Sequence, residues 1–237
     1  MKFICKQSVL NEAVNAVSEE IATVTTVSSD NQTTSVKSSV SSIIEKLPDI
    51  VFHGTISIHR DSLITGIDVY KGYESTDFGQ GFYTTSNYEQ AKRLAYDRAK
   101  AYNKHHKDKP PAQPMVLKYR INKVRLSEYK GLIFDSPNER WKEFIFNNRV
   151  GIDFSVSKYY NKDGRYNFVY GCVADSNITN MVGDIKRQKI TYGEFIDSLK
   201  ALKQYEYDQL SFHTPDVVSA LDLLEIEIIE MEAILIE

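Results

Sequence analysis

The strands that this sequence predicts are short and unevenly spaced, and their spacing is the strongest constraint on the fold. Helical patterns fall between some neighbouring strands, but not in the regular alternation that a doubly wound parallel sheet requires. An α+β domain fits better, because it allows strands and helices to follow one another in any order. The predicted strands lie at 50–53, 81–84, 115–121, 167–174 and 209–213.

Capping patterns predict where three of the helices begin. In each, a hydroxyl side chain precedes a glutamate by three residues, which satisfies backbone N–H groups at a helix start. Apolar residues at helical spacing follow each pattern, and further helices are predicted at 176–187 and after Thr214-Pro215. The three pairs are Ser86 with Glu89, Ser136 with Glu139, and Thr191 with Glu194.

The two ends of the chain differ from its middle. Residues 1–22 predict a strand followed by an amphipathic helix, and residues 23–45 are rich in Ser, Thr and Val. That composition favours a linker or a poorly packed segment, with exposed β structure as the alternative. We therefore divide the chain into a segment at 1–49, a domain at 50–224 and an acidic amphipathic tail at 225–237.

The acidic end of the chain predicts a terminal helix, because large apolar residues recur there at helical spacing. We expect this helix to pack on its own domain, and the alternative is a docking helix for a basic partner or a second copy. The stripe consists of Leu224, Ile228, Met231 and Leu235.

Composition narrows the class of protein. The chain has no run of about 18 apolar residues, so no membrane-spanning helix is predicted, and its start does not resemble a secretory signal. Its two cysteines, Cys5 and Cys172, form no disulfide framework or metal pattern, which favours the cytoplasm. The net charge of -3 argues against broad electrostatic binding to nucleic acid, although a local basic patch along 118–125 is an alternative.

Two motifs near the start of the domain suit ligand binding. In His53-Gly54-Thr55, a histidine at a strand end offers a ring nitrogen, and the glycine exposes its backbone. In residues 77–85, a Gly-x-Gly turn leads into an aromatic strand where Tyr83 could stack on a planar ring. The glycine spacing is not that of a Rossmann dinucleotide-binding turn. For the first motif, the structural alternative is a core histidine that precedes a turn. For the second, it is a turn that precedes a core strand.

A third motif lies on the last predicted strand. There Gln209, Ser211 and His213 share one face, because side chains alternate along a strand. An ordinary edge strand would explain the same pattern.

In this order and spacing, the motifs resemble the ADP-ribosyltransferase superfamily. The resemblance is to its His-Tyr-Glu branch, which includes the diphtheria-toxin-like enzymes and the poly(ADP-ribose) polymerases. More specifically, the chain is similar from Ile50 to Leu224 to the bacterial family called domain of unknown function 3990. The matching motifs are Phe52-His53-Gly54-Thr55, residues 77–85 with Gln90-Ala91, Trp141-Lys142-Glu143-Phe144-Ile145 with Asn148-Arg149, Gly171-Cys172-Val173-Ala174-Asp175, and Gln209-Leu210-Ser211-Phe212-His213-Thr214.

The resemblance implies a split β-sheet with surrounding helices and NAD bound as a substrate, without a metal. His53 would bind a hydroxyl of the nicotinamide ribose, the Gly54 backbone would hold the carboxamide, and Tyr83 would stack on the nicotinamide. The residue that opens the last strand would stabilise positive charge at the anomeric carbon. The implied catalytic residues are Gln209, His53 and Tyr83, and the implied NAD-binding residues are His53, Gly54, Thr55, Gly81, Phe82, Tyr83 and Arg149.

The chain departs from the superfamily pattern at Gln209, where a glutamate is expected. Glutamine can still bind a ribose hydroxyl, but it carries no charge. Neighbouring Asp208 and Glu206 have the wrong strand parity, and Glu143 is an alternative carboxylate on a helix.

The resemblance implies a mono-ADP-ribosyltransferase that modifies a macromolecule. The acidic charge balance favours protein over nucleic acid as the target, and the cysteine usage favours the cytoplasm as its location. By analogy it would be a bacterial toxin or defence effector, with an antitoxin or other partner docking on the tail. The alternatives are an NAD-binding module, an NAD glycohydrolase, and a non-catalytic interaction protein.

Overall fold

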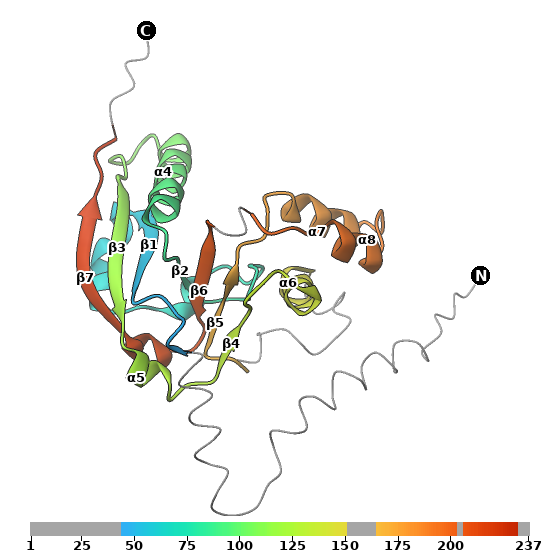
Figure 1. The fold of residues 1–237 in the computed structure, drawn as a ribbon. Coiled ribbons are helices and arrows are strands. Elements are labelled where there is room, and N and C mark those ends of the chain that lie inside the picture. Colours follow the sequence, from blue (N-terminus) through green and yellow to red (C-terminus); the bar gives the residue numbers. More distant parts are fainter. Residues whose placement is uncertain (1–43, 151–164, 203–205, 232–237) are drawn as a thin grey trace, which may run out of the picture. The chain divides into compact units, whose positions relative to one another are not determined.

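The computed structural model describes residues 44–150, 165–202 and 206–231, and these form two β-sheets with helices around them (Figure 1). The first sheet has the order β1–β3–β7 and is antiparallel. The second has the order β2–β6–β5–β4, in which β4 and β5 are parallel. The mixed architecture confirms the α+β prediction. The strands are β1 (Ile50–Ile56), β2 (Phe82–Thr84), β3 (Pro114–Ile121), β4 (Gly131–Ile133), β5 (Phe168–Cys172), β6 (Asp208–Phe212) and β7 (Leu221–Ile228).

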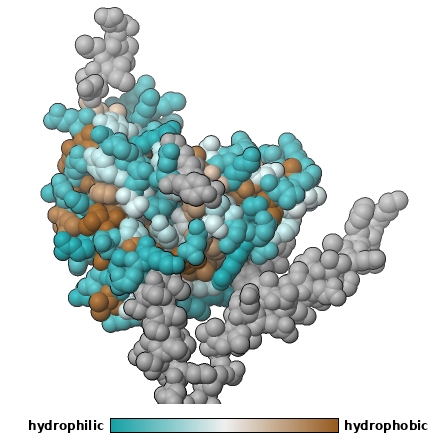
Figure 2. Space-filling model, in the orientation of Figure 1, coloured by the Kyte–Doolittle hydropathy of each residue, from teal (hydrophilic) through white to brown (hydrophobic). Residues whose placement is uncertain are grey.

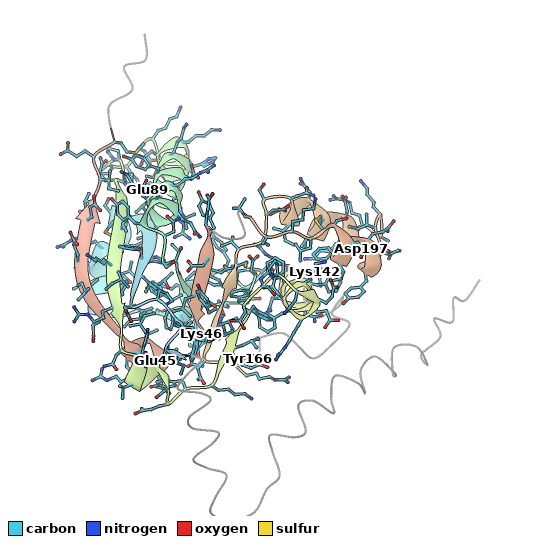
Figure 3. All side chains as sticks on the ribbon, in the orientation of Figure 1. Glu45, Lys46, Glu89, Lys142, Tyr166 and Asp197 are labelled. Carbon is cyan, nitrogen blue, oxygen red and sulfur yellow. The ribbon has the colours of Figure 1, made fainter. Side chains whose placement is uncertain are left out.

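The helices occupy different sides of the two sheets. Helix α4 lies beside β1 and β3, whereas α6, α7 and α8 gather beside β5 and β4 (Figure 1). Charged residues such as Glu89 of α4 and Asp197 of α8 remain exposed (Figure 3). The helices are α3 (Arg60–Thr65), α4 (Tyr88–His105), α5 (Lys123–Leu126), α6 (Glu139–Val150), α7 (Ile178–Lys186) and α8 (Tyr192–Ser198).

The two sheets share one apolar core. One face of each sheet contributes to it, so that burial of these side chains holds the sheets together. A second core lies on the other face of the four-stranded sheet, under α6, α7 and α8. The shared core includes Val51, Phe82, Met115, Leu117, Leu210 and Phe212. The second includes Trp141, Phe144, Phe146, Val169 and Phe195.

Helix α4 approaches β1 unusually closely. Its alanines at 91, 95 and 99 are buried, and they offer little bulk between helix and sheet. A Cβ atom at Gly54 would overlap the backbone carbonyl of Ala91. Gly54 is therefore required by helix packing, which is a different reason from the ligand access that the sequence suggested.

The predicted helix starts are partly confirmed. Thr191 and Glu194 form the expected capping box at α8. Helix α4 begins one residue later than predicted, because Asn87 caps it while Ser86 donates its hydroxyl to Asp208. At α6 the side chain of Asn138 accepts the Trp141 N–H, in place of the predicted Ser136 cap. In both cases a neighbouring asparagine, an equally good cap, is better placed.

The prediction of a terminal helix is wrong for residues 222–228, which belong to β7. This strand pairs antiparallel with β3, from Leu221 opposite Ile121 to Ile228 opposite Met115. The segment alternates apolar and acidic residues in part, and the free edge of β3 supplies the backbone partners that a strand needs. The predicted boundary at 224 therefore falls inside a strand, and residues 232–237 lie outside the described part.

Other predictions for the chain ends have different outcomes. The helix expected after Pro215 is a short 3₁₀ helix, Val217–Ala220, whereas α7 confirms the helix predicted at 176–187. The segment predicted at 1–22 falls outside the described residues, and so does the segment predicted at 23–45 except for its last two residues. Across the described ranges, no helix has both the length and the apolar character needed to span a membrane.

The close packing of α4 leads to a stability prediction. Gly54→Ala should lower the free energy of unfolding by about 3 kcal/mol, because the added methyl group overlaps the Ala91 carbonyl. Urea denaturation measures the change. Gly193→Ala is the control: Gly193 is exposed in α8, and a Cβ atom there would meet only the Thr191 hydroxyl, at an ordinary contact distance of 3.9 Å. Alanine at this helical position should stabilise the protein slightly. Equal stabilities for Gly54→Ala and the unaltered protein would contradict the packing.

Candidate functional site

The sheets separate between β1 and β2. Phe52 and Thr85 form a bridge, with N···O distances of 2.7 and 2.9 Å. The next hydrogen-bonded pair of an antiparallel ladder would be Gly54 with Tyr83, but that pair does not form. Instead, the Tyr83 carbonyl accepts a hydrogen bond from His53 Nδ1 at 2.7 Å, and the Gly54 carbonyl accepts one from Arg98 at 2.8 Å.

The side chains of His53 and Arg98 thus donate to the two carbonyl groups that the backbone N–H groups of a continued ladder would have satisfied. By strand alternation, the backbone N–H groups of Gly54 and Tyr83 face the gap where the ladder stops. We call this place the β1–β2 split and define it by His53, Gly54, Tyr83 and Arg98. It brings together two of the three residues that the sequence nominated as catalytic, His53 and Tyr83.

His53 is held as a neutral imidazole. The ring is half-buried and stacks on Phe82, with 4.3 Å between ring centroids. Burial lowers the pKa of His53 to about 3, and the nearby positive charge of Arg98 contributes. Because Nδ1 must carry the proton donated to the Tyr83 carbonyl, Nε2 is left as a hydrogen-bond acceptor.

Arg98 brings a positive charge to the split, where it donates to the Gly54 carbonyl. Burial and the charges of Arg98 and Lys71 lower the pKa of His59, so these groups lie within electrostatic reach of one another. Neither Arg98 nor Lys71 forms an ion pair with a carboxylate in the part of the chain that the structure describes. The site is therefore suited to an anion such as a phosphate. Sequence reasoning missed Arg98, because no motif marks a lone arginine on a helix.

The Tyr83 side chain points away from the split. Its hydroxyl donates to the Gly79 carbonyl at 2.6 Å and accepts the Phe78 N–H at 3.0 Å, and it contacts Thr76. These bonds fix the phenol against the preceding loop, and burial raises its pKa. Phe82, rather than Tyr83, is the ring that stacks on His53. Tyr83 thus meets the split through its backbone.

Gln209 lies on β6, one strand from the split. Its side chain is buried, and Nε2 donates to Asp77 Oδ2 at 2.9 Å and to the Cys172 carbonyl at 3.0 Å. This pattern sets the orientation of the amide, because only its nitrogen can donate to two oxygens. Oε1 remains an acceptor without a hydrogen bond among the described residues.

Asp77 is the centre of the buried polar network. Its carboxylate is 3% exposed and accepts from Gln209, from the Ala174 N–H at 2.9 Å and from the Arg149 guanidinium at 2.8 and 2.6 Å. Arg149, which the sequence suggested for phosphate binding, is therefore engaged by Asp77. Its position balances the charge of a buried carboxylate.

The other face of β6 behaves as strand alternation predicts. Asp208 points away from Gln209 and accepts from Thr85, Ser86 and Tyr170. On the Gln209 face, His213 Nδ1 donates to the Gln80 carbonyl and its Nε2 lies 2.8 Å from the Ser211 hydroxyl.

The remaining nominated residues serve local packing. A Cβ atom at Gly81 would lie 2.6 Å from the Phe212 carbonyl, so the chain itself fills that space. Thr55 is buried in β1, and Glu143 of α6 accepts a hydrogen bond from Tyr192. Among the described residues, no group of His, Cys, Asp and Glu could hold a metal ion.

The comparisons with known proteins give one match. The family model described as "Protein of unknown function (DUF3990)" matches residues 50–223. The chain belongs to this family. The matched range contains the β1–β2 split, the Asp77 network and the first three residues of β7. No curated protein and no solved structure matches the chain.

The contact between Gln209 and Asp77 predicts that glutamate is not tolerated at 209. Gln209→Glu should lower the free energy of unfolding at pH 7 by about 2 kcal/mol, because it sets a carboxylate against the Asp77 carboxylate and the Cys172 carbonyl. Urea denaturation tests this. In an Asp77→Asn background, the same change should cost less. An identical cost in both backgrounds would show that the two side chains do not interact.

Buried His213 predicts that stability falls in mild acid. Burial lowers the pKa of His213 from 6.5 to about 4, so between these values the unfolded chain binds a proton that the folded protein does not. Stability is therefore retained above pH 6.5 and lost as the pH falls. His213 should contribute a loss of about 2 kcal/mol between pH 7 and pH 5.

Urea denaturation at the two pH values measures this dependence. His213→Gln should reduce it, whereas His105→Gln, at an exposed position in α4, should leave it unchanged. An undiminished pH dependence in His213→Gln would rule out His213 as its source.

Proposed function

We propose that this protein binds NAD at the β1–β2 split and transfers ADP-ribose to a macromolecular target. The observation that carries the proposal is the unformed Gly54–Tyr83 pair beside a neutral imidazole. A planar carboxamide can take the place of the missing strand partner, because backbone N–H groups are the donors that its carbonyl oxygen requires. The sequence resemblance to ADP-ribosyltransferases supports the same chemistry.

His53 supplies a second contact for the substrate. Its Nε2 accepts a hydrogen bond, and a ribose hydroxyl is a suitable donor. The hydrogen bond to the Tyr83 carbonyl fixes the ring orientation, and stacking on Phe82 restricts its motion. The ring is thus ordered before the ligand arrives, which lowers the entropic cost of binding.

The negative charge of the NAD diphosphate suits Arg98 at the split and Lys71, which lies within electrostatic reach of His59. Arg98 keeps donors beyond the one it uses on the Gly54 carbonyl, and no carboxylate of the described chain neutralises it. Lys71 donates to Ser62 at 3.1 Å and likewise remains without an acidic partner there. Phosphate oxygens are strong acceptors for such groups. We therefore assign phosphate binding to Arg98 and Lys71 rather than to Arg149.

In the proposed reaction, the bond between nicotinamide and the anomeric carbon of ribose breaks, and its electron pair leaves with the nicotinamide, which becomes neutral. A nucleophilic atom of the target then bonds to the anomeric carbon and gives up its proton to solvent. Gln209 Oε1 offers a partial negative charge to the developing cation. The Asp77 carboxylate, hydrogen-bonded to the Gln209 amide nitrogen, polarises that amide further.

A second candidate function is an NAD-binding module without turnover. One observation favours it: the Gln209 side chain is 8% exposed and already bonded to Asp77 and Cys172. In that case the substrate would bind at the split and remain intact.

Labelled NAD tests these proposals. The protein is incubated with adenylate-³²P-labelled NAD and a bacterial lysate, and NAD binding is measured separately by calorimetry. Arg98→Ala should weaken NAD binding about ten-fold, and His53→Ala should weaken binding and abolish transfer. Arg140→Ala, at an exposed arginine of α6, is the control for loss of one positive charge and should bind normally.

Each outcome selects among the proposals. Label transferred to a macromolecule by the unaltered protein but not by His53→Ala supports the transferase. Binding without label or nicotinamide release supports the NAD-binding module. Absence of NAD binding by the unaltered protein refutes both.

A further inference from the structure

Strand β7 forms one edge of its sheet, opposite the edge where the β1–β2 split lies. Among the described residues, β3 alone pairs with β7, so the outer side of this eight-residue strand has no strand beside it. Figure 1 shows β7 on the outer flank of the sheet, and Figure 2 shows apolar surface on that flank. We call this outer side the β7 edge. A long edge strand with exposed apolar side chains is a site where another strand can add.

The backbone groups of the β7 edge follow from the ladder with β3. The Ile229 N–H donates to the Pro114 carbonyl at 2.9 Å, so the backbone of residue 229 points toward β3. Backbone direction alternates along a strand, and the N–H and C=O groups of Ile226 and Ile228 therefore point away from β3. These groups are placed to hydrogen-bond an added strand.

A bulge separates the side chains of β7 by charge. The register with β3 shifts between Lys118 and Tyr119, so that Leu224 becomes an extra residue. As a result, the residues paired with Val116, Lys118 and Arg120 on one face of β3 are all acidic, and those on the other face are all apolar. The acidic face of β7 carries Asp222, Glu225 and Glu227, and its apolar face carries Leu221, Leu223, Ile226 and Ile228.

The carboxylates of the acidic face are exposed, and their partners lie on the inner side. Lys118 of β3 approaches Glu225 at 3.7 Å, and Tyr88 of α4 donates to one oxygen of Glu227 at 2.8 Å. Asp222 has no ion pair among the described residues. Directly opposite residues of neighbouring strands have Cβ atoms about 5 Å apart, so an added strand would set its side chains against these carboxylates. Basic side chains would be favourable there.

We propose that the β7 edge binds an extended segment of a partner protein in which basic and apolar residues alternate. Backbone hydrogen bonds to Ile226 and Ile228 add the segment as a further strand of the sheet. Its basic side chains face the acidic face of β7, and its apolar side chains lie beside the apolar face. A second copy of this chain suits the edge poorly, because two antiparallel β7 strands would set their carboxylates against each other. The proposal does not depend on NAD binding.

Peptide binding tests the charge pattern. The full chain is titrated with fluorescent peptides of about seven residues, one alternating lysine with valine and one alternating glutamate with valine. The lysine peptide should bind about ten-fold more tightly than the glutamate peptide. A third peptide with the same lysines and valines in separate blocks should bind more weakly than the alternating one, because it cannot match both faces of β7.

Charge variants locate the binding site on β7. Asp222→Asn and Glu227→Gln should each weaken binding of the lysine peptide about three-fold, since each removes one exposed carboxylate of the acidic face. Asp97→Asn, at an exposed position of α4, is the control for loss of one negative charge and should leave binding unchanged.

Hydrogen exchange tests the backbone contacts. The lysine peptide should slow exchange at the amides of Ile226 and Ile228, which point outward. Ile228→Pro removes one outward N–H without removing a bond to β3, and it should weaken binding about ten-fold. Ile228→Val keeps the N–H and should bind normally. If Ile228→Pro fails to fold, the exchange measurement on the unaltered protein decides the question.

Four results would overturn the proposal. The first is the absence of saturable binding of the lysine peptide, and the second is equal affinity for the lysine and glutamate peptides. The third is unchanged exchange at Ile226 and Ile228 in the presence of the lysine peptide. The fourth is a dimer of the unaltered protein in sedimentation that Ile228→Pro abolishes, which would assign the β7 edge to a second copy.

Discussion

The bridge between Phe52 and Thr85, and its failure to continue, organises the functional side of this domain. An antiparallel ladder gains two hydrogen bonds at each hydrogen-bonded pair, so two strands that form one such pair would ordinarily form the next one as well. Here the His53 and Arg98 side chains satisfy the two carbonyls of the next pair, and this removes the penalty for leaving it open. The two strands can then diverge without leaving the Gly54 and Tyr83 carbonyl oxygens without a hydrogen bond. The proposed NAD site is a direct consequence of that substitution.

Two buried features hold the geometry around the split. On one face, the apolar core between the sheets fixes β1 against β2 through Val51, Phe82 and Leu117. On the other face, the Asp77 carboxylate joins the loop before β2, the helix α6 and the strand β6 through Arg149 and Gln209. A buried carboxylate is costly unless its oxygens are fully used, and this one is bonded to three partners. The network therefore favours one arrangement of loop, helix and strand.

The identity of residue 209 has a physical explanation in this network. A glutamine carries both a donor and an acceptor, and its position beside Asp77 needs the donor. The carboxylate and the amide are thus divided between Asp77 and Gln209, which form one hydrogen-bonded unit. A negative charge therefore lies near the start of β6 even though residue 209 is uncharged. It is carried by the Asp77 carboxylate, which is hydrogen-bonded to Gln209 and paired with Arg149.

Local sequence patterns were enough to predict the α+β class, the capping box at Thr191, the helix α7 and the opposite faces of Asp208 and Gln209. Each of these depends on residues close together in the chain, so periodicity and capping patterns are enough to show them. The sequence alone did not reveal β7, because a segment with both periodicities becomes a strand only when a strand edge is free beside it. The roles of Arg98 and Arg149 were also decided by tertiary structure. Their partners belong to elements distant in the chain, and only the fold brings those elements into contact.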